Sequence, residues 1–579
     1  MDQKRLFLAI AISLAILLGF QYLMPHSKLP PPSATTATTA APIDAAAPRA
    51  ATPADTTAAI PREVPRLKIS APRVSGSISL LGARIDDVVL ADYRETTDKT
   101  SANVHILEPR SEAHPYYVQF GWSAPTGSTL KLPSNDTVWT GAGEVAPGKT
   151  GVLSWNNGEG LTFRIEIGVD ANYMFTVKQS AHNAAGDTAL LFPWARIRRD
   201  YTPTVAGYYV LHEGMVGVLD GTLKEETYAN AKSAGEKKGG IALEATGAGG
   251  WMGITDKYWL IALVPDQAVP LTTAYRHIAE AGQDRYQVDF VAKDPTAIAP
   301  GADATLTTRL FAGAKEVNLL DRYETDEHIP HFDKAVDFGW YYFLTKPFFY
   351  AIDWIYGIVG NFGVAILIFT LIVKLLFFPL ANKSYRSMSK MKLLAPKMTE
   401  LRELHKDQPA ELQKATMALY KAEKVNPASG CLPLLIQIPV FFSLYKVIFV
   451  TIEMRQAPFF GWIHDLSVVD PTNIFNLLGL IPFDPSVISP YLHMGIWPLV
   501  MGITMFLQQK LNPPPPDPMQ AKLFQFMPIL FTFMMAGFPA GLVIYWSWNN
   551  TLTMAQQWFI MRQTNLSKPG RKAGARAST

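Results

Sequence analysis

The chain has 579 residues, of which 48% are apolar and 17% charged, and its formal net charge is +3. Globular domains average about 25% charged residues, which disfavours a wholly soluble protein, yet a mean hydropathy of +0.08 is too low for a chain embedded in membrane throughout. The small net charge argues against nucleic acid as the main partner, and the single cysteine, Cys431, excludes an intramolecular disulfide framework and any multi-cysteine metal site.

Residues 1–24 predict a membrane anchor. Lys4 and Arg5 precede an apolar run from Leu6 to Met24, which is longer than the roughly 7–15 residues of a signal-peptide core. An uncleaved anchor with its N-terminus inside is therefore favoured over a cleavable signal peptide. Residues 25–65 are rich in Pro, Ala and Thr, a composition that predicts a disordered linker because it offers little apolar surface to bury.

Residues 66–330 predict a large all-β sandwich on the outer side of the membrane. Short runs of β-branched and aromatic residues recur between turn-forming clusters, for example in 78–90, 116–122 and 161–169. In 161–169 apolar and polar residues alternate, as in half-buried strands. No convincing helical period is present before about residue 313, and the length exceeds one immunoglobulin-sized sandwich of about 100 residues.

Residues 331–356 are dense in aromatic side chains, with Lys346 and Pro347 between them. This composition indicates a helix in the headgroup region of a membrane. A helix in the core of a bundle is the alternative.

Residues 357–561 predict a core of five membrane spans, since each span needs about 20 apolar residues. We expect the spans at about 357–380, 432–452, 494–510, 523–538 and 541–561. Segment 381–430 and the tail 562–579 are rich in Lys and Arg, whereas 453–493 has one basic residue, Arg455. The positive-inside rule then puts both termini in the cytoplasm and 453–493 outside.

The cytoplasmic segment 383–427 predicts a helical hairpin. Two apolar stripes at helical spacing flank a turn at 407–409, and the outer faces are rich in lysine. The segment is either a solvated loop or a docking surface for a ribosome, an acidic partner or anionic lipid. Its methionines either pack in a core or form an adaptable apolar surface. The residues concerned are Met388, Met391, Met398, Lys421 and Lys424.

Lys374 is the main candidate for function, because it lies inside the first core span. A charge there is costly and usually faces a cavity or a partner, and Thr370, four residues earlier, shares its helix face. The alternative is snorkelling, since Leu380 lies about 9 Å further along the helix at 1.5 Å per residue.

Polar residues on other spans favour a hydrated cavity around this lysine. The last span carries Ser547, Asn550, Thr551 and Gln557 at helical spacing, and the second core span, 432–452, carries Gln437 and Ser443. Polar contacts between helices are the alternative. The spans contain no paired carboxylates, which disfavours a proton-driven pump, and we find no catalytic, cofactor or metal constellation, so we expect a protein that is not an enzyme.

Several segments of the last 240 residues together resemble the YidC-type membrane protein insertases of Gram-negative bacteria, which are relatives of the Oxa and Alb insertases. The segments are 417–427 (MALYKAEKVNP), 430–439 (GCLPLLIQIP), 455–458 (RQAP), 462–466 (WIHDL), 517–519 (DPM) and 538–542 (FPAGL). The resemblance implies an inner-membrane protein with five core helices around a hydrophilic groove, open to the cytoplasm and to lipid. It also implies a periplasmic β domain that is similar in fold to sugar mutarotases but lacks their activity.

The family places one positive residue in the groove, and Lys374 stands at that position where the family pattern has arginine. Tyr545 and Trp546 stand where the family places substrate-contacting aromatics. The implied partners are nascent membrane proteins, the Sec translocon with its accessory subunits, the ribosome and membrane lipids. No cofactor and no sequence-specific nucleic-acid binding are expected. A small-solute transporter and a membrane-anchored sugar-active protein are the alternatives, although the internal repeat typical of transporters is not found.

Overall fold

The computed structural model describes residues 64–205, 211–280, 282–405, 408–423, 432–483, 485–488, 492–512 and 518–566. The predicted anchor 1–24, almost all of the linker 25–65, Lys424, Cys431 and the end of the basic tail lie outside the described residues.

The first of two antiparallel sheets has ten strands in the described chain. Its order is β1-β2-β3-β5-β10-β17-β16-β13, with β4 beside β3 and β18 beside β10. The strands are β1 (Arg66–Ser70), β2 (Val74–Ser79), β3 (Arg84–Arg94), β4 (Asn103–Leu107), β5 (Tyr116–Ser123), β10 (Ala189–Arg199), β13 (Ile241–Ala248), β16 (Pro270–Glu280), β17 (Gln283–Ala292) and β18 (Thr296–Ile298).

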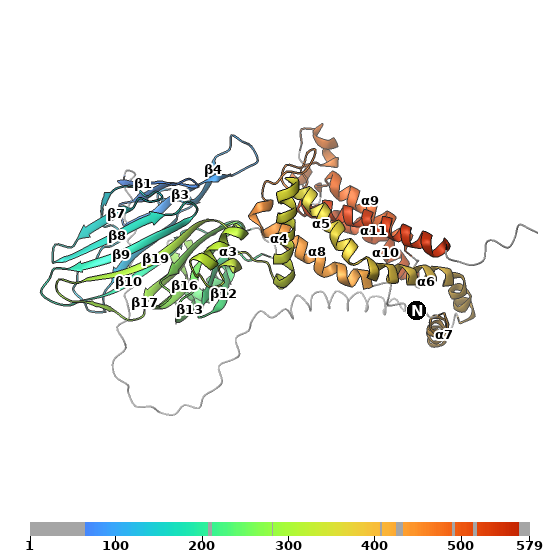
Figure 1. The fold of residues 1–579 in the computed structure, drawn as a ribbon, viewed down its shortest axis with the longest axis horizontal. Helices are drawn as coiled ribbons and strands as arrows, with labels where there is room; N and C mark the ends of the chain where they lie inside the picture. The colour runs from blue at the N-terminus through green and yellow to red at the C-terminus, as the bar shows by residue number, and fades with distance from the viewer. Residues whose placement is uncertain are drawn as a thin grey trace, which may run out of the picture. The chain divides into compact units, whose positions relative to one another are not determined.

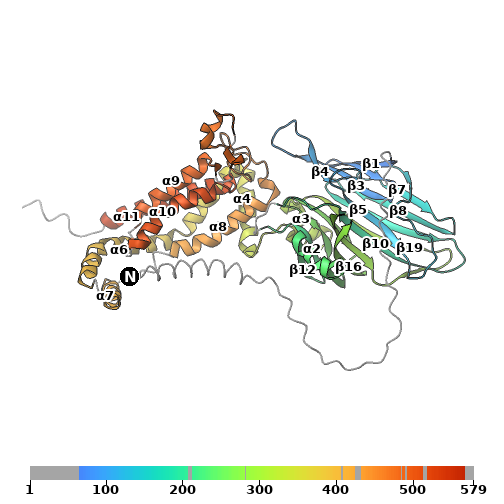
Figure 2. The same cartoon turned by 180° about the vertical axis from the view of Figure 1, so that it is seen from behind.

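The second sheet has nine strands in the order β12-β11-β14-β15-β19-β9-β8-β7-β6. They are β6 (Thr140–Ala142), β7 (Gly151–Asn156), β8 (Leu161–Val169), β9 (Met174–Asn183), β11 (Gly214–Leu219), β12 (Thr222–Thr227), β14 (Trp251–Thr255), β15 (Trp259–Pro265) and β19 (Asp303–Ala314). The two sheets face each other (Figures 1 and 2), and Trp122 of the first contacts Phe163 of the second with ring centroids 4.9 Å apart.

The predicted strand at 161–169 is β8. Its odd-numbered residues from Leu161 to Val169 are buried and the intervening side chains are more exposed, because successive strand residues point to opposite faces. The predicted run 78–90 is divided between β2 and β3, which pair as a hairpin. The fold class of a large β-sandwich is confirmed.

One helix in this domain was not predicted. Helix α2 (Tyr228–Lys237) begins where the Thr227 hydroxyl accepts a hydrogen bond from the Asn230 amide, a typical N-cap. Only Tyr228, Ala231 and Gly235 of the helix are buried. The mostly polar sequence therefore carries little helical periodicity, and a search for a helical period before residue 313 could not reveal this helix.

The C-terminal part is helical. It follows α3 (Val317–Asp326) and η1 (Phe332–Ala335), and it contains α4 (Tyr342–Val359), α5 (Phe362–Leu376), α6 (Phe378–Leu404), α7 (Pro409–Ala422), α8 (Leu432–Val450), η3 (Ile452–Met454), η4 (Ile474–Gly479), η5 (Pro485–Val487), α9 (Ile496–Leu511), α10 (Pro518–Met535) and α11 (Ala540–Leu566). Helix α4 packs on α5 and α8, and α11 packs on α9 and α5. Where α9 approaches α10, a Cβ added at Gly502 would come within 2.1 Å of the Thr532 hydroxyl, so a side chain there would force the two helices apart.

The predicted first span is broken. Helix α5 ends at Leu376 and α6 begins at Phe378 with a bend of 67°. Pro379 stands in the first turn of α6, where its ring is tolerated but blocks a continuous helix. Across the described residues, no individual helix has both the length and the apolar character required to traverse a bilayer, whereas α5 with the first half of α6 meets both criteria as a bent pair.

Candidate substrate groove

Lys374 lies near the end of α5 and reaches two neighbouring helices. Its ammonium donates a hydrogen bond to the Thr553 hydroxyl of α11 at 2.9 Å and makes a longer contact of 3.5 Å with the Gln437 side-chain oxygen of α8. Helix α11 is held against α5 nearby, where the Trp548 indole donates to the Leu367 carbonyl at 3.1 Å. The lysine therefore stands where α5, α8 and α11 meet.

Both partners of Lys374 are oriented as acceptors. The Thr553 hydroxyl uses its single proton on the Asn549 carbonyl at 2.7 Å, so its lone pairs are left for the ammonium. The Gln437 amide nitrogen donates to the Tyr545 hydroxyl at 2.5 Å, which turns the Gln437 oxygen toward Lys374. Tyr545 is buried and fixes this amide.

No carboxylate neutralises Lys374 in the described part of the chain, since none of the ion pairs found there includes it. Lys446, the lysine of α8, behaves differently. Lys446 in α8 pairs with the Asp337 carboxylate at 2.9 Å. Burial raises the pKa of Asp337, but Lys446 more than offsets this effect, so the pKa lies below its ordinary value. Lys446 is thus compensated by a carboxylate, whereas Lys374 has no such partner among the residues that the structure describes.

The polar residues predicted on the last span point in more than one direction. The Asn550 amide donates to the Thr504 hydroxyl of α9 at 3.2 Å, and the Gln557 amide contacts the Leu511 carbonyl at 3.3 Å. Ser547 and Thr551 donate to carbonyls of their own helix. The structure thus places Asn550 and Gln557 against α9, away from the contacts of Lys374.

The other predicted groove residues have local contacts. Thr370 is buried and donates to the Ile366 carbonyl at 2.6 Å. Ser443 is buried, and its hydroxyl has no partner among the described residues. Trp546, beside Tyr545, packs against Phe441 of α8 with centroids 4.6 Å apart. The predicted aromatic pair therefore divides its contacts between a polar partner, Gln437, and an apolar one.

Two residues of the site were missed by the sequence analysis. Thr553 contacts Lys374 directly, and Asn549, one turn earlier, is buried with a side-chain oxygen that has no partner in the described regions. Asn549 and Thr553 are four residues apart in the sequence, so they lie on the same face of α11. Together they form a second polar face of α11, beside the predicted one. Their four-residue spacing is the signal in the sequence that could have identified them.

The helical hairpin residues lie on α6 and α7. Met398 is buried, Met388 and Met391 are half-buried, and Lys421 is exposed. Lys397 of α6 pairs with Glu423 just beyond α7 at 2.8 Å. Met398 is thus used for packing, and Lys421 and Lys397 face outward.

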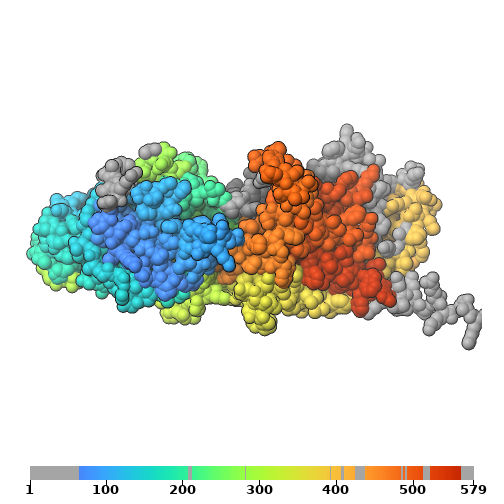
Figure 3. Space-filling model, turned by 90° about the horizontal axis from the view of Figure 1, so that it is seen from above, coloured from blue at the N-terminus to red at the C-terminus, as the bar shows by residue number. Residues whose placement is uncertain are grey.

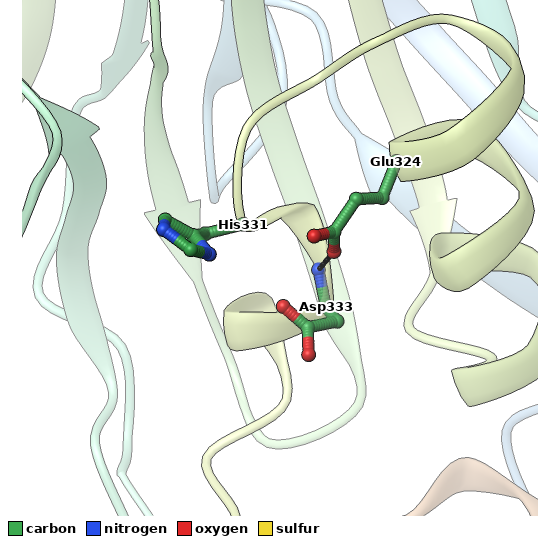
Figure 4. Close-up of side chains that lie close together, drawn as sticks. All are labelled: Glu324, His331 and Asp333. Atoms are coloured by element: carbon green, nitrogen blue, oxygen red, sulfur yellow. Dashed lines mark hydrogen bonds between the residues drawn. The ribbon is translucent and has the colours of Figure 1, made fainter.

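A separate polar cluster joins α3, η1 and α4. Glu324, His331 and Asp333 place their potential ligand atoms within 4.8 Å of one another (Figure 4). Asp333, however, already accepts a hydrogen bond from Lys346 at 2.5 Å and another from Tyr342. Lys346 thus already neutralises the Asp333 carboxylate that a metal ion would need as a ligand. The cluster therefore links α4 to η1 through hydrogen bonds.

Comparison with known proteins identifies relatives over nearly the whole chain. Residues 66–351 match a family model described as the YidC periplasmic domain, and residues 354–568 match one described as the 60Kd inner membrane protein. The membrane protein insertase YidC of Granulibacter bethesdensis is 60% identical over 98% of this chain and 99% of its own length. The membrane protein insertase YidC of Acidiphilium cryptum is 55% identical over 86% of this chain and 85% of its own length. A crystal structure of an active YidC insertase is 18% identical, covering 85% of this chain and 92% of that one with a TM-score of 0.35.

Proposed function

The chain belongs to the YidC family of membrane protein insertases, and from this premise we propose that it inserts clients through a groove whose single positive charge is Lys374. The relatives named as insertases span 46–60% identity, which favours insertion over transport of small solutes or action on sugars. The observation that carries the proposal is a lysine at the junction of α5, α8 and α11 whose partners among the described residues are neutral.

The Lys374 ammonium has an N–H donor available for a client protein. An ammonium group offers three N–H donors, of which Thr553 takes one and Gln437 is close to a second. A carboxylate in the translocated tail of a client can accept the third. In a partly hydrated groove this attraction exceeds its value in bulk water, because the effective dielectric constant is lower.

The groove lowers the barrier and the lipid supplies the driving force. A polar tail that contacts Lys374 avoids complete desolvation in hydrocarbon, which is the main cost of crossing. The apolar helix of the client then partitions into lipid, and about 20 apolar residues suffice for this step. No cofactor and no nucleotide are required at this protein.

We extend the proposal to topology and partners. A multi-pass protein of the bacterial inner membrane, with both termini and the α6–α7 hairpin in the cytoplasm and the β domain in the periplasm, follows the distribution of Lys and Arg along the sequence. The exposed lysines of the hairpin, such as Lys421, suit the acidic surfaces of a ribosome or of anionic lipid. Cooperation with the Sec translocon and its accessory subunits is part of the same proposal.

Insertion of a single-span client into proteoliposomes tests the role of the charge. We expect Lys374→Ala and Lys374→Glu to impair insertion and Lys374→Arg to preserve it, because only the last keeps the positive charge. The matched control is Thr551→Ala, since this exposed hydroxyl bonds only to the Ser547 carbonyl. If Lys374→Ala inserts every client as the unmodified protein does, the groove charge has no role.

A deletion tests the role of the hairpin. Removal of residues 387–420 is expected to abolish insertion while the protein still reaches the membrane. A deletion variant that is present in the membrane and fully active would reduce the hairpin to a connecting loop.

A further inference from the structure

The segment between α8 and α9 carries an exposed apolar loop, whose described residues are 474–483 and 485–488 and which includes η4 and η5. Five of its apolar residues are among the more exposed of the described residues: Leu477 57%, Leu478 56%, Leu480 82%, Val487 80% and Ile488 72%. Proteins surrounded only by water rarely expose a contiguous apolar patch of this kind unless it serves an interaction.

The sequence of the loop is unsuited to water. No charged residue occurs between Asp470 and Asp484, and the intervening stretch contains the run LLGLIPF from 477 to 483. Charged or polar side chains would normally be interspersed on a solvated loop of this length. The composition instead matches that of segments that contact hydrocarbon.

The base of the loop is fixed at the start of α9. The Asp470 carboxylate accepts hydrogen bonds from the Trp497 amide at 2.8 Å and from the Trp462 indole at 3.1 Å. The side-chain amide of Asn473 donates a hydrogen bond to the backbone carbonyl of Leu492 at 2.9 Å, so the two ends of the loop are held together. Tryptophan is enriched at the level of the lipid headgroups, so the loop leaves the protein at the depth where α9 enters the membrane.

The direction in which the loop projects from the helices also favours contact with lipid. In Figures 1 and 2 the orange segment that precedes α9 rises from the side of the bundle, across the direction in which α9 runs. Seen from above in Figure 3, the same segment stands at the surface of the bundle. A loop that projects sideways at the level of the headgroups meets lipid, whereas one that continued along the helix axis would enter water.

We propose that the apolar loop, through its described residues 474–483 and 485–488, inserts into the outer leaflet of the membrane, with Leu480, Val487 and Ile488 at the boundary between headgroups and acyl chains. Apolar side chains held in this way reach about 5–10 Å below the surface. The loop thereby anchors the start of α9 in the lipid. The choice of the outer leaflet rests on the proposed topology, whereas contact with lipid follows from the exposure, composition and direction of the loop.

Fluorescence quenching in vesicles tests the proposal without any need for insertion activity. In the full chain with Cys431→Ser, Leu480→Cys and Val487→Cys are each labelled with the dye NBD and reconstituted in phosphatidylethanolamine and phosphatidylglycerol. Both substituted side chains are exposed, so the label does not disturb the core. The matched control is Thr188→Cys, an exposed position on a loop of the β domain.

We expect nitroxide on the lipid acyl chains to quench the dye at 480 and 487 at least about threefold more strongly than at 188, as for an interfacial segment. Iodide in the water is expected to show the reverse order. Strong quenching by iodide at 480 and 487 would place the loop in water, and quenching by neither agent would mean that another protein surface covers it. Either result would overturn the proposal.

A second variant tests whether apolar contact holds the loop in place. With Leu478→Asp and Leu480→Asp together, the dye at 487 is expected to become accessible to iodide. If quenching by lipid nitroxide persists unchanged, partition of these side chains into lipid is not the cause. Quenchers confined to the inside or the outside of the vesicles identify the leaflet, so an error in the proposed topology is distinguished from an error in the lipid contact.

Discussion

The attraction between Lys374 and an acidic client residue can be isolated by a double-mutant cycle. Lys374→Met removes the charge but keeps an unbranched side chain, and the client is used with Asp or with Asn in its translocated tail. Two unit charges 4 Å apart interact by about 1 kcal/mol in water and about 4 kcal/mol at an effective dielectric constant of 20. For the half-buried Lys374 we therefore expect a coupling of roughly 2 kcal/mol, or about thirtyfold in rate at about 1.4 kcal/mol per tenfold.

The assay is the rate at which the client tail becomes protected from protease in proteoliposomes. We expect Lys374→Met to slow the client with Asp about thirtyfold more than it slows the client with Asn, because this ratio measures the coupling of roughly 2 kcal/mol. Lys374→Arg serves as the control that keeps the charge. Equal losses for both clients would refute the reasoning, since the lysine would then act without reference to the charge of the client.

Two further predictions concern contacts around the groove and outside the membrane. Thr553→Val is expected to reduce insertion about ten- to a hundredfold, because hydrogen bonds to charged groups contribute about 1.5–3 kcal/mol and about 1.4 kcal/mol corresponds to a factor of ten in rate. Thr551→Val, which changes an exposed residue, should have no measurable effect; equal effects would contradict the assigned contact. Glu453 accepts a hydrogen bond from the Val317 amide at 2.9 Å, and burial raises its pKa from 4.5 to about 8. The folded protein thus holds a proton that the unfolded chain releases, and stability falls as the pH rises from about 4.5 to 8. The melting temperature in detergent should follow this trend and become flatter in Glu453→Gln; an identical slope in both proteins would exclude Glu453 as its source.

The sequence predicted the features that depend on hydropathy and charge. The alternation in 161–169 is a local consequence of one face being buried, and β8 has this pattern. Lys374 was identified because a charge in an apolar run is conspicuous without any knowledge of its neighbours. Similarly, the family resemblance rested on contiguous motifs, and the relatives confirm it.

Features that depend on packing could not be predicted in the same way. Helix α11 touches α5, α8 and α9, so its polar residues serve more than one neighbour, and spacing alone does not say which face meets the lysine. Asn550 turns to Thr504 of α9, whereas Thr553 turns to Lys374. The bend between α5 and α6 depends on Pro379, whose effect on an apolar run is invisible to hydropathy.

Site-specific crosslinking tests most directly whether clients pass beside Lys374. A photoreactive residue replaces Gln437 or Thr553, which contact the lysine, or Asn550 or Gln557, which face α9. The client is a ribosome-stalled membrane protein. We expect it to crosslink to positions 437 and 553, and we expect weak crosslinks or none at positions 550 and 557. Strong crosslinks from 550 and 557 with none from 437 and 553 would contradict a path along the face of Lys374.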